Sequence, residues 1–365
     1  MDYCLLCSEQ INTFIESYYK TPNGSVCKKC GDELFAMTKG FELMNVYTPL
    51  VQRFSLTPVQ IYKELNEYVI GQEDAKKSLS IAVYNHYKRL HPSTILPDIV
   101  LEKSNILLAG PSGTGKTYMC KCISKLVDVP FVIVDATTFT QAGYIGEDIE
   151  SMLTKLYIES GKDISKTEKG IIFIDEIDKI AAKQTIGRDA SGLGVQQALL
   201  KFLEGSKVNV PVSLHKDNKE IVQINTDNIL FICSGAFVNL ENYTDEDYIK
   251  FGLIPELLGR LPIKVKTDKL TIDELSKVIS KSKNNIISQY KKLFKIDNID
   301  LCFSEDSILY ISELCYKTSL GARSIRTIFE RILKEAMFNY PGTDRKRLVI
   351  NKEYIIKQLD NDKHQ

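Results

Sequence analysis

The feature that most constrains the fold is a glycine-rich segment that directly follows a short apolar run. The run is Asn-Ile-Leu-Leu-Ala at 105–109, and Gly-Pro-Ser-Gly-Thr-Gly-Lys-Thr follows at 110–117. In this G-x-x-x-x-G-K-T pattern, backbone N–H groups surround phosphate oxygens, and a helix begins near the lysine. We therefore predict a strand, a phosphate-binding loop and a helix. The loop residues are Gly110, Pro111, Ser112, Gly113, Thr114, Gly115, Lys116 and Thr117.

A second apolar run supplies acidic partners for this loop. Gly-Ile-Ile-Phe-Ile at 170–174 is followed by Asp175 and Glu176, and such a continuous run suits a strand buried on both faces. Lys116 should reach the β- and γ-phosphates, while Thr117 and Asp175 should hold Mg²⁺. Glu176 should polarise the attacking water as a general base. The alternative is a solvated acidic turn after a core strand.

Further apolar runs extend the same pattern. Phe131–Val134 and Ile229–Cys233 read as strands, separated by helical stretches. This alternation predicts an α/β fold, a parallel sheet wrapped by helices, with the nucleotide at the carboxyl ends of the strands. Ser234, after the second run, is placed to sense a γ-phosphate, although a turn serine is an equally sensible interpretation.

Two arginines later in the chain are candidates for phosphate contacts. Arg323 lies in Gly-Ala-Arg at 321–323, before a helix that we expect to run to about Phe338. It could fold back onto the phosphates from a small helical lid. Arg260 lies between a glycine and a proline turn, and such an arginine can serve a neighbouring subunit's nucleotide as a finger. Taken alone, each could equally be a surface arginine.

The amino-terminal segment carries a metal-type cysteine pattern. Cys4 and Cys7 form one C-x2-C pair, and after 19 residues Cys27 and Cys30 form a second. Four thiolates complete the tetrahedron that zinc accepts, so we predict a structural zinc ion. About 30 residues bury little core, so the metal would supply folding energy. The other five cysteines are scattered and read as small buried hydrophobes.

Composition excludes several classes of protein. The chain has 365 residues, with 47 Lys+Arg against 47 Asp+Glu, so its net charge is zero. This balance counts mildly against a dedicated nucleic-acid binder. No apolar run approaches 18 residues, and the start resembles neither a secretory signal nor a transit peptide. We therefore expect a cytoplasmic location and no membrane partner.

We expect four segments in the chain. Thr57 and Pro58 have the form of a helix cap followed by proline at the first helical position. The predicted segments are a zinc-binding module at 1–37, a linker at 38–57, a nucleotide-binding α/β domain at 58–262 and a small helical lid domain at 263–365.

The order of motifs resembles the ClpX family of AAA+ unfoldases, which partner the ClpP peptidase. The resemblance covers nearly the whole chain, from Cys4 to about residue 350. Besides the cysteines and the phosphate loop, it depends on these blocks: Tyr-Val-Ile-Gly-Gln at 68–72, Gly-Tyr-Ile-Gly-Glu-Asp at 143–148, Ile-Asp-Glu-Ile-Asp at 174–178, Leu-Ile-Pro-Glu-Leu-Leu-Gly-Arg at 253–260 and Gly-Ala-Arg at 321–323.

The resemblance implies an AAA+ domain in a homo-hexameric ring that hydrolyses ATP and threads protein through a central pore. Its cofactors would be ATP, Mg²⁺ and Zn²⁺, and adaptors could bind the zinc module. The roles implied are adenine contacts for Val69 and Ile70, a trans finger for Arg260, a lid sensor for Arg323, a substrate-gripping pore loop for Tyr144 and Ile145, and a second pore loop for Arg188.

Three departures from the family pattern affect the predicted function. Leu193 stands where the family usually has an acid, and the family's basic pore-entrance loop keeps only His215 and Lys216. The family's insertion that docks on ClpP is missing after Ser234. We therefore predict a protein remodeller that works independently of ClpP. The alternatives are an ATPase subunit that feeds a ClpP-type protease through other contacts, a nucleic-acid-acting AAA+ ATPase, and a regulatory module that uses nucleotide as a switch.

Overall fold

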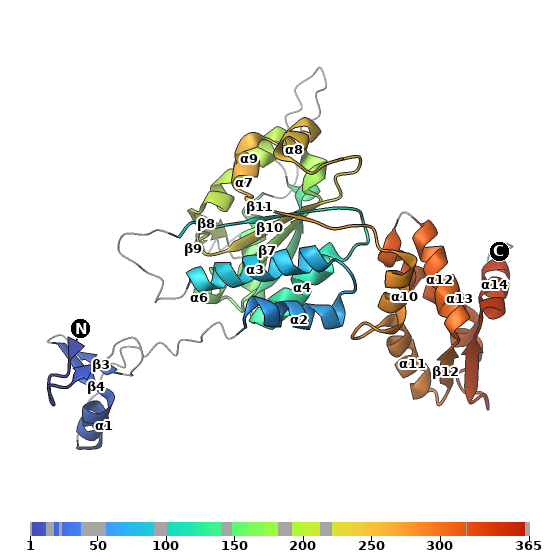
Figure 1. The fold of residues 1–365 in the computed structure, drawn as a ribbon, viewed down its shortest axis with the longest axis horizontal. Coiled ribbons are helices and arrows are strands. Elements are labelled where there is room, and N and C mark those ends of the chain that lie inside the picture. Colours follow the sequence, from blue (N-terminus) through green and yellow to red (C-terminus); the bar gives the residue numbers. More distant parts are fainter. Residues whose placement is uncertain are drawn as a thin grey trace. The chain divides into compact units, whose positions relative to one another are not determined.

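The computed structural model describes residues 2–11, 18–21, 24–37, 56–90, 101–139, 148–181, 192–211, 221–318 and 320–361 (Figure 1). The described residues fall into two compact units, one before residue 56 and the other from residue 56 onward. Three predicted pore residues and most of the predicted linker lie outside the described ranges. They are Tyr144, Ile145, Arg188 and residues 38–55.

The first unit is a small module of paired strands and one helix. Strand β1 (Asp2–Tyr3) pairs antiparallel with β2 (Gln10–Ile11), and β3 (Tyr18–Thr21) pairs antiparallel with β4 (Gly24–Cys27). Helix α1 (Lys28–Met37) follows β4 directly. The buried apolar cluster described in this unit consists of Cys4, Ile11 and Val26. So small a core cannot hold a fold by burial alone.

The second unit is built around a parallel sheet of five strands, in the order β11-β5-β10-β7-β6. Every neighbouring pair in this order is parallel. The strands are β5 (Ile106–Ala109), β6 (Phe131–Asp135), β7 (Ile171–Asp175), β10 (Leu230–Gly235) and β11 (Ile263–Lys266). The predicted fold class, a parallel sheet wrapped by helices, is confirmed.

Helices cover both faces of this sheet (Figure 1). One side carries α2 (Pro58–Tyr68), α3 (Glu73–Arg89) and α4 (Lys116–Val127), with α3 against β11 and α4 against β7. The other side packs into one apolar core with α5 (Ser151–Glu159), α7 (Gly192–Glu204), α8 (Asp245–Phe251) and α9 (Pro255–Gly259). Shorter elements complete the domain: η2 (Ala136–Thr138), α6 (Ile164–Thr167), η3 (Ile177–Ile180) and the antiparallel pair β8 (Lys207–Pro211) and β9 (Ile221–Asn225).

The predicted start of α2 is confirmed in detail. The Thr57 hydroxyl accepts a hydrogen bond from the Gln60 N–H, and the Gln60 side chain accepts one from the Thr57 N–H at 2.7 Å. This reciprocal pair satisfies two N–H groups that have no partner inside the helix. Pro58, at the first helical position, has no N–H to satisfy.

A second apolar core lies beyond β11 and is made by the last part of the chain. Its elements are α10 (Ile272–Ser280), α11 (Ile286–Ile296), β12 (Asp300–Phe303), α12 (Glu305–Lys317), η4 (Gly321–Arg323), α13 (Ser324–Asn339), β13 (Arg347–Ile350) and α14 (Lys352–Asn361). The helix predicted after Arg323 is confirmed. The parallel pairing of β12 with β13 was not predicted, because only helices were expected here. Within the described ranges, no helix has both the length and the apolar character needed to cross a bilayer.

Candidate functional site

The phosphate loop lies between β5 and α4, and two of its glycines are required by close contacts with neighbouring backbone. Gly110 has φ 143° and Gly113 has φ 76°, values that favour glycine. A Cβ on Gly110 would overlap the carbonyl oxygen of Thr267, and one on Gly113 would overlap that of Leu320. Any side chain at these two positions would therefore displace the neighbouring backbone.

Lys116 is the first residue of α4, and its side chain turns back under the loop. Its ammonium donates to the carbonyl oxygens of Gly110 at 2.6 Å and Pro111 at 2.9 Å. Burial lowers the pKa of Lys116 to about 8, although Asp175 acts in the opposite direction. Phosphate oxygens would favour the charged form of this lysine.

Asp175, at the end of β7, is held at both carboxylate oxygens. The Thr117 hydroxyl donates to Oδ2 at 3.4 Å, and the Glu176 N–H donates to Oδ1 at 3.0 Å. Glu176 adopts the left-handed conformation, with φ 57° and ψ 32°, so the chain turns sharply after the strand. A hydroxyl beside a carboxylate suits Mg²⁺, which prefers oxygen ligands. Thr117 and Asp175 therefore fit the ion predicted for them.

A cavity of about 470 Å³ brings most of the predicted nucleotide-binding residues together. This volume lies in the range of ligand pockets. The predicted residues that line it are Val69, Ile70, Ser112, Gly113, Thr114, Gly115, Lys116, Thr117, Asp175, Glu176 and Arg323. Gly110 and Pro111 do not line the cavity, but their carbonyl oxygens accept hydrogen bonds from the Lys116 ammonium and so hold it in place.

Arg323 reaches this cavity from η4 in the second core. The Ala322 N–H donates to the Gly113 carbonyl at 3.3 Å, which fixes η4 against the phosphate loop. Arg323 also acts electrostatically on Lys116, because its positive charge disfavours the charged form of the lysine. The two cations therefore face the same space, where a polyphosphate would satisfy both.

Arg260 is elsewhere, outside the lining of the cavity. Its guanidinium forms an ion pair with Glu204 at the end of α7, with 2.7 Å between Nη2 and Oε1. About half of each side chain is exposed, 52% for Arg260 and 45% for Glu204. Glu204 was not identified from the sequence, because no local pattern connects it to Arg260.

The lining also includes residues that were not predicted from the sequence to belong to the site, and they come from segments that are far apart in the chain. Tyr68, Asp178, Leu270, Lys283, Gln289 and Arg326 are among them. Asp178 was visible in the acidic block at 174–178, and its Oδ1 accepts from the Ala236 N–H at 3.1 Å. Ser234 is fully buried, and its hydroxyl finds no hydrogen-bond partner within the described residues.

The four amino-terminal cysteines form a compact cluster in the first unit. Their sulfur atoms all lie within 4.8 Å of one another, and those of Cys7 and Cys27 are 3.7 Å apart. Zinc–sulfur bonds of about 2.3 Å place tetrahedral sulfurs about 3.8 Å apart, so the cluster fits zinc. Burial alone raises the pKa of the Cys4 thiol, but three backbone N–H donors more than offset this and lower it to about 6. At Cys4 the thiolate that a metal needs is thus favoured, whereas hydrogen bonds with neighbouring thiols raise the pKa of Cys7 and Cys30.

A phosphate loop after a parallel strand, an acidic pair at the end of a strand two places away in the same sheet and an arginine from a second domain define a P-loop ATPase of the AAA+ class. Residues 101–264 match the family described as AAA domain (Cdc48 subfamily). Residues 270–346 match the C-terminal, D2-small domain of ClpB protein.

Three relatives are similar over most of this chain, and each is named ATP-dependent Clp protease ATP-binding subunit ClpX. The protein from Treponema denticola is 43% identical over 373 aligned positions, which cover 92% of this chain and 89% of the relative. For Borrelia duttonii the identity is 45% over 336 positions, 82% and 78% of the two chains. For Porphyromonas gingivalis it is 40% over 406 positions, 99% and 97%. The chain therefore belongs to the ClpX family and is an ATPase with ATP and Mg²⁺ as cofactors.

The lowered pKa of Lys116 predicts how nucleotide binding depends on pH. As the pH rises above 8, a growing fraction of the lysine is neutral, so that binding a phosphate is increasingly accompanied by proton uptake. The dissociation constant for ATP should therefore rise between pH 7.5 and 9.5, by at most about tenfold per pH unit. Lys116→Arg stays charged at these pH values and should show a flat profile. Parallel profiles for the two proteins, measured by calorimetric titration, would contradict this assignment.

The cysteine cluster predicts a stability that depends on zinc. Cys27→Ser should remove zinc from the purified protein and expose residues 1–37 to limited proteolysis. The rate of ATP hydrolysis should stay within about twofold, because the nucleotide site lies in the other unit. Cys302→Ser changes a partly exposed cysteine outside the cluster and should retain the metal. If elemental analysis of the unmodified protein finds no stoichiometric zinc, the cluster is not a zinc site.

Proposed function

We propose that this chain is an ATP-driven protein unfoldase that forms a homo-hexamer and threads polypeptide through its pore. The observation that supports this most is the cavity whose walls come from both large and small domains. The phosphate loop supplies one wall and η4, with Arg323, supplies another. Hydrolysis in such a cavity changes contacts that join two domains, and this can produce movement.

The residue roles in this proposal follow the geometry of the site. Lys116 binds the β- and γ-phosphates, and Thr117 and Asp175 hold Mg²⁺, which stabilises charge on the phosphates. Glu176 accepts a proton from the attacking water. Arg323 contacts the phosphates of its own chain, while Arg260, outside that cavity, serves the next subunit in the ring. The same proposal includes the division of the chain after residues 37, 57 and 262 into zinc module, linker, nucleotide-binding domain and lid domain.

Contact with the substrate is assigned to residues outside the described ranges. Tyr144 and Ile145 stand between Gly143 and Gly146. Flanking glycines permit a wide range of backbone conformations, and an aromatic side chain next to an aliphatic one can pack on any polypeptide. Arg188 belongs to the second proposed pore loop. The zinc module is the proposed site for adaptors or cargo.

A nucleic-acid-acting ATPase is the alternative from a different class. The net charge of zero counts against it, because phosphate backbones attract basic proteins. A strongly salt-dependent affinity for DNA would favour this alternative over unfolding.

The unfolding activity can be tested at Tyr144. Tyr144→Ala should keep ATP hydrolysis within about twofold but reduce unfolding of a stable tagged protein at least tenfold, because the grip on the substrate is lost. Tyr144→Phe is the matched control and should retain unfolding, since it keeps the aromatic ring. The assay is loss of fluorescence from a tagged fluorescent protein in the presence of ATP. Equal unfolding by the alanine variant would remove Tyr144 from the mechanism.

We further propose that the chain works without a peptidase partner, although its relatives are named as subunits of the Clp protease. The Porphyromonas gingivalis alignment spans 406 positions against 365 residues here, so that relative contains segments this chain lacks. In this chain β10 is followed by a short segment, residues 236–244, that leads directly into α8. The protruding docking insertion has no counterpart in this described segment.

The short segment is packed down rather than extended. The buried Phe237 ring contacts the rings of Tyr248 at 5.0 Å and Phe251 at 5.2 Å. Asp245 pairs with Lys264 on β11, and Lys266 lies 5.0 Å from the Tyr243 ring centroid. These contacts anchor the segment at Phe237 and Tyr243 and fix the start of α8 that follows it, so that only short exposed stretches lie between the anchors. Val238 is the exposed large apolar side chain of the segment.

A degradation assay tests this independence. The full chain is mixed with ClpP, ATP and a tagged substrate, and we expect unfolding without degradation above the rate of ClpP alone. A single docked side chain contributes only about 1.5–3 kcal/mol, so six copies of an apolar contact are needed for tight docking. Processive degradation would refute the proposal. Its loss in Val238→Ser would then assign the docking contact to Val238.

A further inference from the structure

The side chain of Gln72 is bonded to a backbone segment far away in the sequence. Its Nε2 donates to the Asp268 carbonyl at 2.6 Å, and the Asp268 N–H donates to its Oε1 at 3.0 Å. An amide side chain offers both a donor and an acceptor, so it satisfies both backbone groups of one residue. The two hydrogen bonds join the α2–α3 loop, residues 69–72, to the connector, residues 267–271, between β11 and α10.

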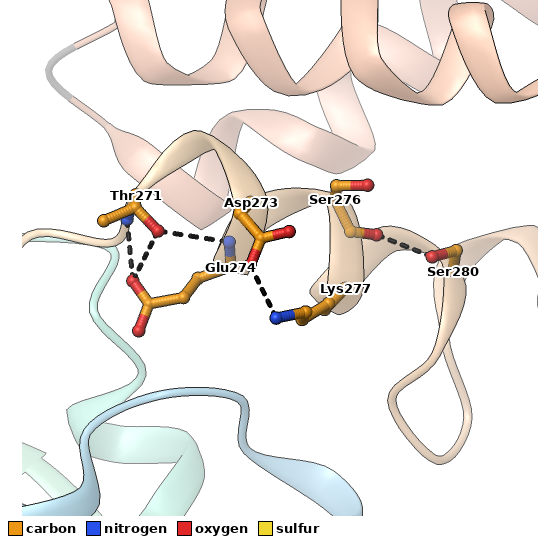
Figure 2. Close-up of polar contacts among 6 residues, drawn as sticks. All are labelled: Thr271, Asp273, Glu274, Ser276, Lys277 and Ser280. Carbon is orange, nitrogen blue, oxygen red and sulfur yellow. Dashed lines mark hydrogen bonds and ion pairs between the residues drawn. The ribbon is translucent and has the colours of Figure 1, made fainter.

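The connector is held at both ends as well. At its start the Thr267 N–H donates to the Ala109 carbonyl at 2.8 Å, and the hydroxyls of Thr267 and Thr114 are 2.8 Å apart. At its end Thr271 caps α10 (Figure 2). The Thr271 N–H donates to Glu274 Oε2 at 2.8 Å, and the Glu274 N–H donates to the Thr271 hydroxyl at 3.2 Å. Asp268 thus lies between the phosphate loop and the first helix of the small domain.

The α2–α3 loop fits closely against this connector. Gly71 and Gln72 both adopt left-handed backbone, with φ 69° and φ 59°. A Cβ on Gly71 would overlap Oε1 of Glu274, the residue that completes the capping box of α10 with Thr271. Left-handed backbone is unfavourable for a residue with a Cβ, and the two bonds to Asp268 offset this at Gln72.

The other end of the loop is fixed by a buried lysine. Lys76, only 2% exposed, donates to the Val69 carbonyl at 3.2 Å and to Glu73 Oε1 at 3.0 Å. Val69 and Ile70 lie between this attachment and Gln72, and both line the nucleotide cavity. Gln72 itself is not part of that lining.

We infer that Gln72 is a positioning residue that couples the base-contacting wall of the cavity to the connector of the small domain. Gln72 holds Val69 and Ile70 in place for the base, and the same bonds fix Asp268. Occupation of the base site is thereby transmitted to the segment that leads into the small domain. This inference rests on the proposed function and on the adenine contacts that the resemblance to the ClpX family implies for Val69 and Ile70.

The test compares ATP with a ligand that has no base. In the full chain, Gln72→Ala should raise KM for ATP about three- to tenfold, the factor that one net hydrogen bond carries. The value of kcat should stay within twofold, and so should inhibition by inorganic tripolyphosphate, because the phosphate loop is unchanged. Gln72→Gly removes the same amide but accepts left-handed backbone without strain. The same shift in both variants therefore assigns the effect to the lost amide.

Hydrogen exchange gives a second readout. In the unmodified protein ATP should slow exchange of a peptide that covers 267–272, and tripolyphosphate should slow it less. In both Gln72 variants this difference between the two ligands should disappear. Asp268→Asn is the matched control, because it breaks the exposed ion pair to Lys266 but keeps the Asp268 backbone groups that Gln72 bonds, and neither residue lines the cavity.

Three results would overturn the inference. They are an unchanged KM in the Gln72 variants, an equal loss of ATP and tripolyphosphate binding, or the same KM shift in Asp268→Asn. Failure of the unmodified chain to hydrolyse ATP would instead refute the proposed function, so the two failures are distinguishable.

Discussion

The close approach of Thr267 to the phosphate loop is the contact on which the nucleotide site depends. Thr267 is fully buried, its N–H bonds the Ala109 carbonyl, and its own carbonyl occupies the space where Gly110 would carry a Cβ. The same residue begins the connector to the small domain, which returns to the loop where Ala322 bonds Gly113. The loop is thus fixed from two directions, and its glycines serve domain contacts as well as phosphate binding.

The parts of the structure that could be predicted from the sequence are those whose conformation is determined by residues close to one another in the chain. Thr57 and Pro58 begin α2 through bonds that span one helical turn, and the strand before Asp175 is buried because its run is apolar throughout. The pairing of β12 with β13 has no such signal, since each strand has only four residues and its partner lies beyond two helices. The bond from Gln72 to Asp268 likewise joins residues 196 positions apart. Contacts of this kind arise from packing, which local patterns do not encode.

The acidic residues that follow β10 show that the position of charged side chains in the fold determines what they contribute. Three acids follow one another in this part of the chain: Asp245, Glu246 and Asp247. In the fold they form the first turn of α8, where their negative charge interacts favourably with the positive end of the helix dipole. Asp247 also completes a capping box with Thr244. The segment after β10 therefore leads into a helix start that is stabilised locally, and Tyr248 of that helix packs against Phe237.

The two cations central to the proposed mechanism differ in how they are held, and the difference suits their roles. Lys116 is buried against backbone carbonyls, and its lowered pKa reflects the cost of that burial, so a phosphate is needed to complete its surroundings. Arg260 is half exposed and paired with Glu204, and exposed pairs contribute only about 0–1 kcal/mol. Glu204 can therefore orient the guanidinium without trapping it. An arginine that must leave its own chain's carboxylate for a neighbour's triphosphate needs a weak partner of this kind, because a buried ion pair would cost several kcal/mol to break.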